Sequence, residues 1–195
     1  MELLSLLNNK EKELGKIVHL KKNHILFHEN EKCEHIGIVI SGNLTISSYS
    51  LNGREIIYNF ISKDEMFGNN LIFSDKPFFR GNVISNSDSE IFLINKENLL
   101  KIFADNQEFL LKFLSFNAEF TKRLNFQIKL LSFTSAEERL TYYLEENNPL
   151  SFKNVSSLAK TLHLSRETLS RLLTKLIKEK VINRKGNILY LAKSV

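Results

Sequence analysis

The segment Leu164–Ile182, which reads LSRETLSRLLTKLIKEKVI, limits what this chain can fold into more than any other part. At 100° per residue its leucines fall within one stripe, which is typical of a helix that packs one side on a core. A separate face carries two arginines, a glutamate and a small hydroxyl, which suit hydrogen bonding to base edges in the DNA major groove. The leucines are Leu169, Leu172, Leu173 and Leu176, and the candidate reading residues are Arg166, Glu167, Ser170 and Arg171.

The neighbouring residues predict a helix-turn-helix with a wing. Ser165 stands at the expected N-cap of this helix, with Thr168 in the first turn. A shorter helix is expected over Asn154–Leu162 with Asn154 as its N-cap, which leaves the three to four residues that such a turn uses. Asn183–Leu191 predicts a two-stranded wing that turns at Gly186-Asn187. The alternative is a surface helix with solvated charges, but that alternative does not explain all four elements in order.

Positive charge is concentrated at the same end of the chain. Residues 1–134 contain 16 Lys and Arg against 16 Asp and Glu, whereas residues 135–195 contain 11 against 6. The whole net charge of +5 therefore lies in the last third. Such a local excess is expected of a phosphate-binding surface, for which Lys153 and Lys185 are candidates. A basic face can also serve solubility alone.

The residues Ser165-Arg166-Glu167-Thr168, followed by Arg171, resemble the recognition helix of the Crp–Fnr family, the cyclic-AMP receptor protein group. The resemblance implies that this helix docks in the major groove of DNA. It also implies that Arg166, Glu167 and Arg171 contact base edges and that Ser165 contacts a phosphate. The family often has glycine at the turn, where this chain has His163, a residue that tolerates positive φ better than most.

Residues 15–95 are strand-like. His35–Ile46 alternates with period two around Gly42-Asn43, which predicts a hairpin. Asn52-Gly53 predicts a second hairpin, followed by the alternating residues Ile56, Tyr58 and Phe60. Another turn is expected at 86–89. Many short strands with such turns indicate a sandwich or a barrel.

A long helix without proline or glycine is predicted over Asn106–Phe133, after a short helix over Lys96–Phe103 and before another over Ser135–Asn147. Apolar residues recur in it at steps of three and four, which favours a coiled-coil seam between two copies of the chain. A single buried helix in a monomer would give the same stripe, but about 28 residues exceed what a small barrel needs to cover it. The predicted dimer contacts are Phe109, Phe113, Phe116, Phe120, Leu124, Gln127 and Leu131.

The order of these parts is similar to the Crp–Fnr plan along nearly the whole chain. The resemblance implies an α+β protein with an N-terminal cyclic-nucleotide-binding-like β-roll, a jelly-roll barrel, over residues 1–105. It also implies a dimerisation helix over 106–134 and a winged helix-turn-helix over 135–195. The expected partners are a two-fold symmetric double-stranded DNA site, a second copy of the chain and RNA polymerase.

The segment Met66–Gly81 is similar to the family's phosphate-binding cassette. In cyclic-nucleotide binders the cassette carries a glycine, a glutamate for the ribose, and an arginine with a small hydroxyl residue for the phosphate. Here Asn69 replaces the glutamate and Gly81 replaces the hydroxyl residue, so an effector other than cyclic AMP is expected. The candidate effector residues are Gly68, Asn69, Asn70, Arg80, Gly81 and, on the long helix, Gln127. Arg80 has the alternative of being an ordinary surface charge.

Histidines and the single cysteine crowd the N-terminal quarter: His19, His24, His28, Cys33 and His35. Their spacings fit no zinc-finger pattern, so no metal site is assigned, and satisfied or exposed histidines are expected. A haem or redox sensor of the same family is one alternative, with Cys33 in a polar loop. A cupin-type metal enzyme is another, but its later histidine would have to be His163, inside the DNA-binding part.

Composition excludes several other classes. One cysteine allows no internal disulfide and no cysteine-ligated iron–sulfur cluster. No apolar run approaches the roughly 20 residues needed to cross a bilayer, and the first residues show no signal-peptide pattern. No nucleophile–base motif or phosphate-cradling glycine loop is present. The sequence therefore predicts a cytoplasmic regulator that is not an enzyme, with an unidentified small-molecule effector and no membrane partner.

Overall fold

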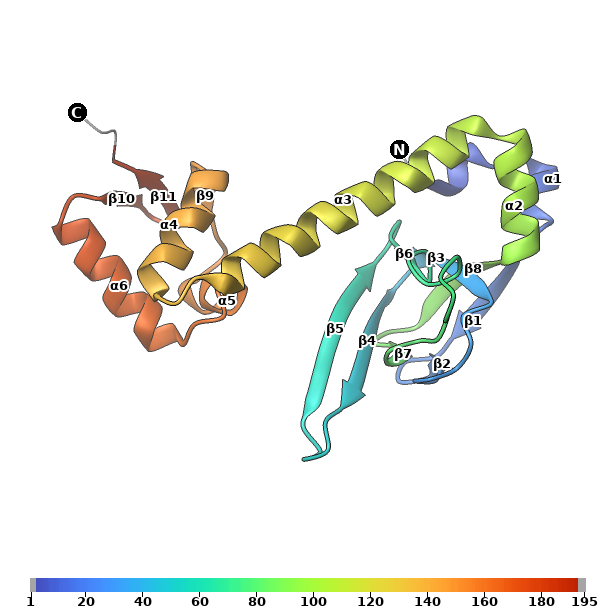
Figure 1. Cartoon of the computed structure of the whole chain (residues 1–195), viewed down its shortest axis with the longest axis horizontal. Helices are drawn as coiled ribbons and strands as arrows, with labels where there is room; N and C mark the ends of the chain where they lie inside the picture. Colours follow the sequence, from blue (N-terminus) through green and yellow to red (C-terminus); the bar gives the residue numbers. More distant parts are fainter. Residues whose placement is uncertain (1–2, 193–195) are drawn as a thin grey trace. The chain divides into compact units, whose positions relative to one another are not determined.

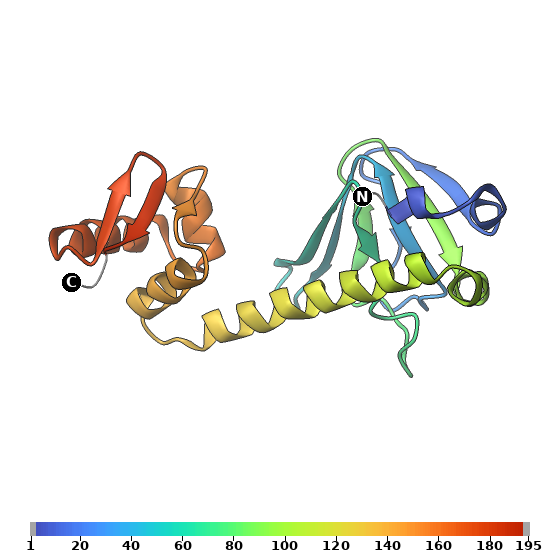
Figure 2. The same cartoon turned by 90° about the horizontal axis from the view of Figure 1, so that it is seen from above.

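The computed structural model describes residues 3–192 in two compact units, which divide between Glu119 and Phe120. The first unit contains η1 (Leu3–Leu6), α1 (Asn9–Lys12), eight strands, α2 (Lys96–Asp105) and the start of α3 (Gln107–Ser132). The second contains the rest of α3 and everything that follows it. Figures 1 and 2 show the elements of each unit. Among the described helices, none is long and apolar enough to cross a membrane.

Two antiparallel four-stranded sheets make up most of the first unit, with strand orders β1-β8-β3-β6 and β2-β7-β4-β5. Their strands are β1 (Lys16–Leu20), β2 (Ile25–Phe27), β3 (His35–Ser41), β4 (Asn43–Tyr49), β5 (Glu55–Ser62), β6 (Met66–Phe67), β7 (Asn82–Ser85) and β8 (Ser89–Asn95). Fully buried side chains from both sheets, such as Ile38 and Leu44, share one hydrophobic core. The predicted sandwich or barrel is therefore the fold of this unit.

The prediction of a hairpin at Gly42-Asn43 is wrong. β3 belongs to one sheet and β4 to the other, so the chain changes sheets at Gly42 instead of turning back on the same one. Gly42 has φ +80°, and a Cβ there would lie 2.6 Å from the carbonyl oxygen of Asp88. Glycine is needed because this position combines left-handed backbone with close backbone approach. The hairpin at Asn52-Gly53 is confirmed, since β4 pairs with β5 around it.

Aromatic packing fixes the start of α3 in the first unit. Phe109 is fully buried and Phe113 is 4% exposed. The ring of Phe113 lies 4.9 Å from that of Phe103 and 6.4 Å from that of Phe73, measured between centroids. The expectation that Phe109 and Phe113 form a dimer seam is therefore wrong, because their side chains are enclosed within their own protomer.

The second unit is a winged helix-turn-helix. It contains α4 (Ala136–Glu146), β9 (Leu150–Ser151), α5 (Val155–Thr161), α6 (Arg166–Lys178), β10 (Ile182–Lys185) and β11 (Ile188–Leu191). The predicted wing is present as β10 and β11, and it is extended by a short third strand that was not expected, β9, which pairs with β11. Leucines from α3, α4, α5 and α6 form a separate core around the fully buried Leu130, Leu140, Leu144 and Leu176.

Candidate nucleic-acid interface and sensing segment

The recognition helix α6 is oriented by its leucines. Leu169, Leu173 and Leu176 are at most 2% exposed and Leu172 is 9% exposed, so this stripe faces the core of the second unit. Arg166, Glu167, Ser170 and Arg171 are exposed on the other side of the helix. The predicted division of α6 into a packing side and a solvent side is thus present. The exposed side offers donors and an acceptor of the kinds that base edges in the major groove match.

Both helices of the motif begin at the residues expected to cap them. The Oγ of Ser165 accepts from the backbone N–H of Thr168 at 3.0 Å and lies 2.9 Å from the Thr168 hydroxyl. The Oδ1 of Asn154 accepts from the N–H of Ser157 at 2.8 Å. Each cap satisfies a backbone donor that the first turn of a helix leaves unpaired. The side chains of Ser165 and Asn154 therefore stabilise the first turns of α6 and α5, respectively.

The turn between α5 and α6 depends on left-handed backbone at His163. Its φ is +54°, which confirms that histidine fills the position where glycine is common. The N–H of Leu164 then donates to the carbonyl of Ala159 at 2.9 Å, so the chain reverses within a few residues. A β-branched residue would be strained at this φ, because its Cβ substituents crowd the backbone.

An ion pair joins α6 to α4, and a hydrogen bond joins the wing turn to the loop before α5. Lys175 of α6 donates to Glu137 of α4 at 2.7 Å. In the wing, the side chain of Asn187 donates to the carbonyl of Lys153 at 2.9 Å, which ties the loop before α5 to the wing turn. Lys153 and Lys185 are exposed on these two segments, and neither forms an ion pair with any residue between 3 and 192. Both ammonium groups are available for phosphate.

Glu167 is ionised at neutral pH. Its pKa is lowered, first by its own backbone N–H and then by the Ser165 hydroxyl, with further contributions from the charges of Arg166 and Arg171. A carboxylate at the first turn is also favoured by the helix dipole. Glu167 therefore acts as an acceptor only, which suits the amine of cytosine and opposes contact with a phosphate.

The cassette residues do not all come together. Asn69 is 8% exposed, and its side-chain amide donates to the Oδ1 of Asn117 on α3 at 2.9 Å. Asn70 and Arg80 lie on the surface of the first unit. Gln127, expected beside the effector, belongs to the second unit, where its Oε1 lies 3.4 Å from the Nε2 of His163. Asn117 is thus an α3 residue that forms a hydrogen bond with the cassette, and its sequence signal is an asparagine among the helix's apolar residues.

Two glycines shape this segment. Gly68 has φ +76°, and a Cβ there would lie 2.7 Å from the carbonyl oxygen of His35. At Gly81, a Cβ would lie 2.7 Å from the carbonyl oxygen of Ser47 and 3.1 Å from the Tyr58 ring. The backbone of β4 therefore excludes a side chain at residue 81, which is where cyclic-nucleotide binders of the resembling family carry a hydroxyl.

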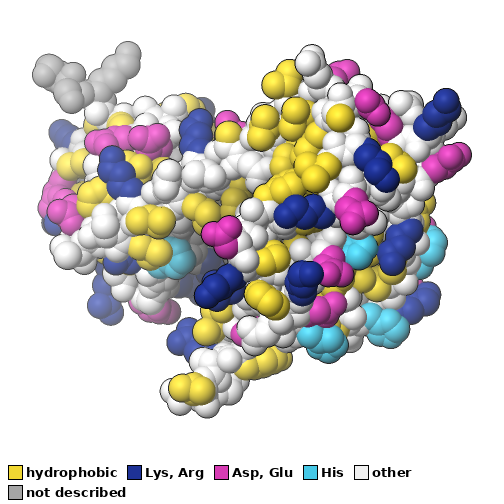
Figure 3. All heavy atoms as spheres, turned by 45° about the vertical axis from the view of Figure 1, so that its right-hand side comes forward, with side chains coloured by type: hydrophobic (Ala, Val, Ile, Leu, Met, Phe, Trp, Pro, Cys, Tyr) yellow, Lys and Arg dark blue, Asp and Glu magenta, His cyan; other side chains and the backbone are white. Residues whose placement is uncertain are grey.

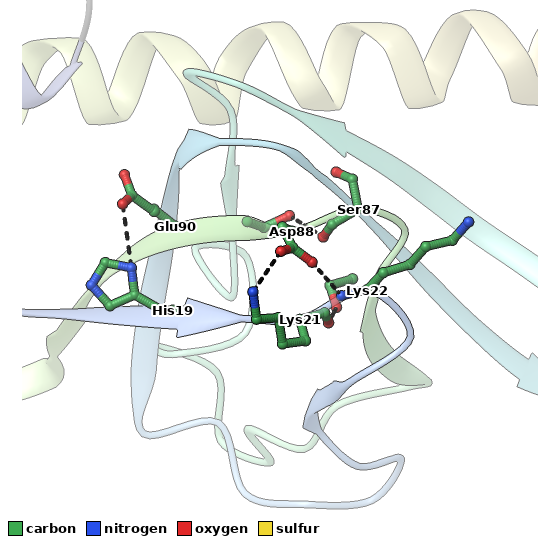
Figure 4. Close-up of polar contacts among 8 residues, drawn as sticks. His19, Lys21, Lys22, Ser87, Asp88 and Glu90 are labelled. Carbon is green, nitrogen blue, oxygen red and sulfur yellow. Dashed lines mark hydrogen bonds and ion pairs between the residues drawn. The ribbon is translucent and has the colours of Figure 1, made fainter.

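The histidines of the first unit do not converge. Figure 3 shows histidine side chains at the surface, interspersed with acidic and basic ones. Figure 4 shows His19 paired with Glu90 at 3.3 Å, beside a separate ion pair of Lys21 with Asp88 at 2.8 Å. His35 stacks on a phenylalanine of β2, with the ring centroids 6.5 Å apart. Within residues 3–192, no group of three or more His, Cys, Asp or Glu side chains is placed to hold a metal ion.

Cys33 is a buried thiol. It is 2% exposed, and its Sγ donates to the carbonyl of His35 at 3.4 Å. Burial raises its pKa to about 11. Since the thiolate is the reactive form, the protonated, enclosed thiol is poorly suited to redox sensing.

Comparison with known proteins agrees with both units. The family model described as "Cyclic nucleotide-binding domain" matches residues 17–106, and that described as "Bacterial regulatory proteins, crp family" matches residues 157–182. No curated protein sequence matches the chain. The described structure is similar to a transcriptional regulator from Thermotoga maritima, with 28% identity and a TM-score of 0.60 over 68% of this chain and 98% of that one.

Two further solved structures match along almost the full length. The catabolite activator protein of Thermus thermophilus has 21% identity and a TM-score of 0.59, covering 97% of this chain and 92% of that one. The CO-dependent transcription factor CooA of Carboxydothermus hydrogenoformans has 20% identity and a TM-score of 0.54, covering 98% and 92%. At 20–21% identity, the similarity of these two structures to this chain shows a shared fold and no more. With the two family matches, the α+β architecture is that of a transcriptional regulator with an N-terminal cyclic-nucleotide-binding-like β domain.

The chain belongs to the Crp family of bacterial regulatory proteins. It is accordingly a DNA-binding transcriptional regulator, in a family that is not enzymatic.

The burial of Cys33 predicts slow chemistry at its thiol. Iodoacetamide at pH 7.5 should modify the native protein at least about tenfold more slowly than the urea-unfolded protein, because thiolate formation and access are both restricted. Mass spectrometry of timed samples measures the two rates. Equal rates would show that Cys33 is accessible and would restore it as a candidate redox sensor.

Proposed function

We propose that this regulator binds a two-fold symmetric DNA site as a homodimer and reads it with α6. The observation that carries the proposal is the exposure of Arg166, Glu167, Ser170 and Arg171 on the side of α6 opposite its buried leucines. Arg166 and Arg171 are assigned to guanine and Glu167 to a cytosine amine. Lys153 and Lys185 are assigned to phosphates. Ser165 and Thr168 contribute mainly by starting the helix, and Asn154 by starting α5.

The homodimer is proposed on the exposed apolar residues of α3. Leu114, Leu124, Ile128 and Leu131 are between 47% and 66% exposed, and successive members of this set lie ten, four and three residues apart on the helix. A stripe of this kind is stable when a second helix covers it, as in a coiled coil. Phe120 is half-buried, and Phe116 is half-buried and packs against the core of the first unit. The proposed seam thus keeps Leu124 and Leu131 from the sequence expectation and adds Leu114 and Ile128.

The proposed effector is not cyclic AMP. Asn69 lacks the carboxylate expected for a ribose, and its amide is engaged by Asn117. The carbonyl of Ser47 leaves no room for a hydroxyl side chain at residue 81. Effectors of the fold are not uniform, since one of the similar structures is a CO-dependent factor. An unidentified small molecule is therefore proposed, and the buried thiol of Cys33 argues against the redox alternative.

The place of action follows from the proposed target. A regulator that binds operator DNA works in the cytoplasm of a bacterium, and RNA polymerase is the proposed further partner.

The reading assignment predicts a base-specific defect. Arg171→Ala should cost about 1–3 kcal/mol of binding free energy and should relax the preference at one position per half-site. Lys185→Ala should weaken all sequences alike and flatten the salt dependence, because a phosphate contact carries no sequence information. Shift assays on singly substituted duplexes at two salt concentrations measure both. If Arg171→Ala weakens every duplex equally, Arg171 contacts phosphate and the assignment fails.

Introducing negative charge into the proposed dimer seam should convert the dimer into monomers. Leu124→Asp with Ile128→Asp should dissociate the dimer, since burial of each such side chain contributes about 1.5–3 kcal/mol. Lys112→Asp, on an exposed part of the same helix away from the stripe, is the matched control and should stay dimeric. Light scattering gives the molar mass. A double variant that remains a dimer would place the interface elsewhere.

The altered cassette predicts weak or no binding of cyclic AMP. Loss of a charged partner costs about 1.5–3 kcal/mol, so calorimetry should detect no micromolar complex. A cyclic-AMP receptor protein titrated in the same buffer is the positive control. A dissociation constant of about 1 μM or below for this chain would refute the prediction.

A further inference from the structure

The turn between α5 and α6 is contacted by two residues outside the helix-turn-helix itself. The Nη1 of Arg139, on α4, donates to the backbone carbonyl of His163 at 3.4 Å. The Oε1 of Gln127, on α3, lies 3.4 Å from the Nε2 of the His163 ring. All three residues belong to the second unit. His163 is thus held through its backbone by one helix and through its side chain by another.

Arg139 also reaches back to the end of α3. Its Nε donates to the carbonyl of Phe133, the residue that follows α3, at 3.1 Å. One guanidinium therefore joins the end of α3 to the turn that precedes α6. His163 lies two residues before the N-cap Ser165, so a group that fixes His163 also fixes where α6 begins.

We propose that Gln127, Arg139 and His163 are positioning residues that set the angle of α6 to the second half of α3, and through it the spacing of the two DNA half-sites. This inference rests on the proposed function. Gln127 lies on the helix that carries Leu124, Ile128 and Leu131, the proposed dimer contacts. In a symmetric dimer the separation of the two recognition helices depends on the orientation of each α6 relative to that shared helix pair.

Polar contacts are suited to this role for a physical reason. Apolar packing is non-directional, so the buried leucines fix which side of α6 faces the core without sharply fixing the direction of the helix axis. Hydrogen bonds depend steeply on geometry and therefore select one orientation. Contacts at 3.4 Å between partly exposed groups contribute little to global stability, so their loss should change orientation more than folding.

The test varies half-site spacing. The wild-type dimer is assayed by fluorescence anisotropy on its operator and on duplexes in which the half-sites stand one base pair closer or further apart. One base pair rotates a half-site by roughly a tenth of a helical turn, so the wild type should bind the altered duplexes at least about tenfold more weakly. Gln127→Ala and His163→Asn should reduce this discrimination to about threefold or less. Asparagine tolerates the positive φ of residue 163 but does not reach Gln127 as the imidazole does.

Three further measurements separate positioning from folding. Gln127→Glu keeps an acceptor oxygen at the same place and should restore wild-type discrimination. Gln107→Ala removes the only other glutamine, at the exposed start of α3, and should change nothing. The double variant Gln127→Ala with His163→Asn should behave like either single variant, because both remove the same contact.

The outcomes are distinct. Wild-type spacing discrimination in both Gln127→Ala and His163→Asn overturns the inference, as does an equal loss of affinity on all three duplexes. A wild-type protein that binds DNA without any spacing preference, or does not bind it, overturns the proposed function as well. Relaxed spacing with unchanged thermal unfolding, rescued by Gln127→Glu, supports the positioning role.

Discussion

The burial of four leucines along α6 decides what this protein can present to DNA. Leu169, Leu172, Leu173 and Leu176 enter the core of the second unit, so the rotation of the helix about its axis is fixed by apolar packing. Everything on the opposite side is then exposed, including both arginines and the ionised Glu167. The caps at Ser165 and Asn154 and the left-handed turn at His163 fix where the two helices begin and end.

The parts governed by local rules were predictable from the sequence. The stripe of α6, its N-cap, the positive φ at His163 and the wing turn at Gly186 all follow from side chains within a few residues. The hairpin at Gly42 was wrong because Gly-Asn specifies a tight turn but does not say whether the next strand joins the same sheet. The prediction that Phe109 and Phe113 form a dimer seam is wrong for a similar reason. Helical periodicity gives the apolar side of a helix and not the identity of what covers it.

The contacts that join distant segments were not predictable from one sequence. The Asn69–Asn117 bond joins residues 48 positions apart, and the His163–Gln127 contact joins residues 36 apart. In each pair, the sequence around one residue does not indicate which residue is its partner. The first contact joins α3 to the cassette within the first unit, and the second joins α3 to the turn of the helix-turn-helix within the second unit.

Selection of bound duplexes from a random pool by the purified protein tests most directly whether two copies of α6 read a symmetric site. This measurement does not require any operator to be assumed in advance. We expect an inverted repeat whose half-sites lie about one helical turn apart, with guanine and cytosine at the discriminated positions. Enrichment of a single asymmetric motif, or of no motif at all, would contradict the proposed symmetric reading.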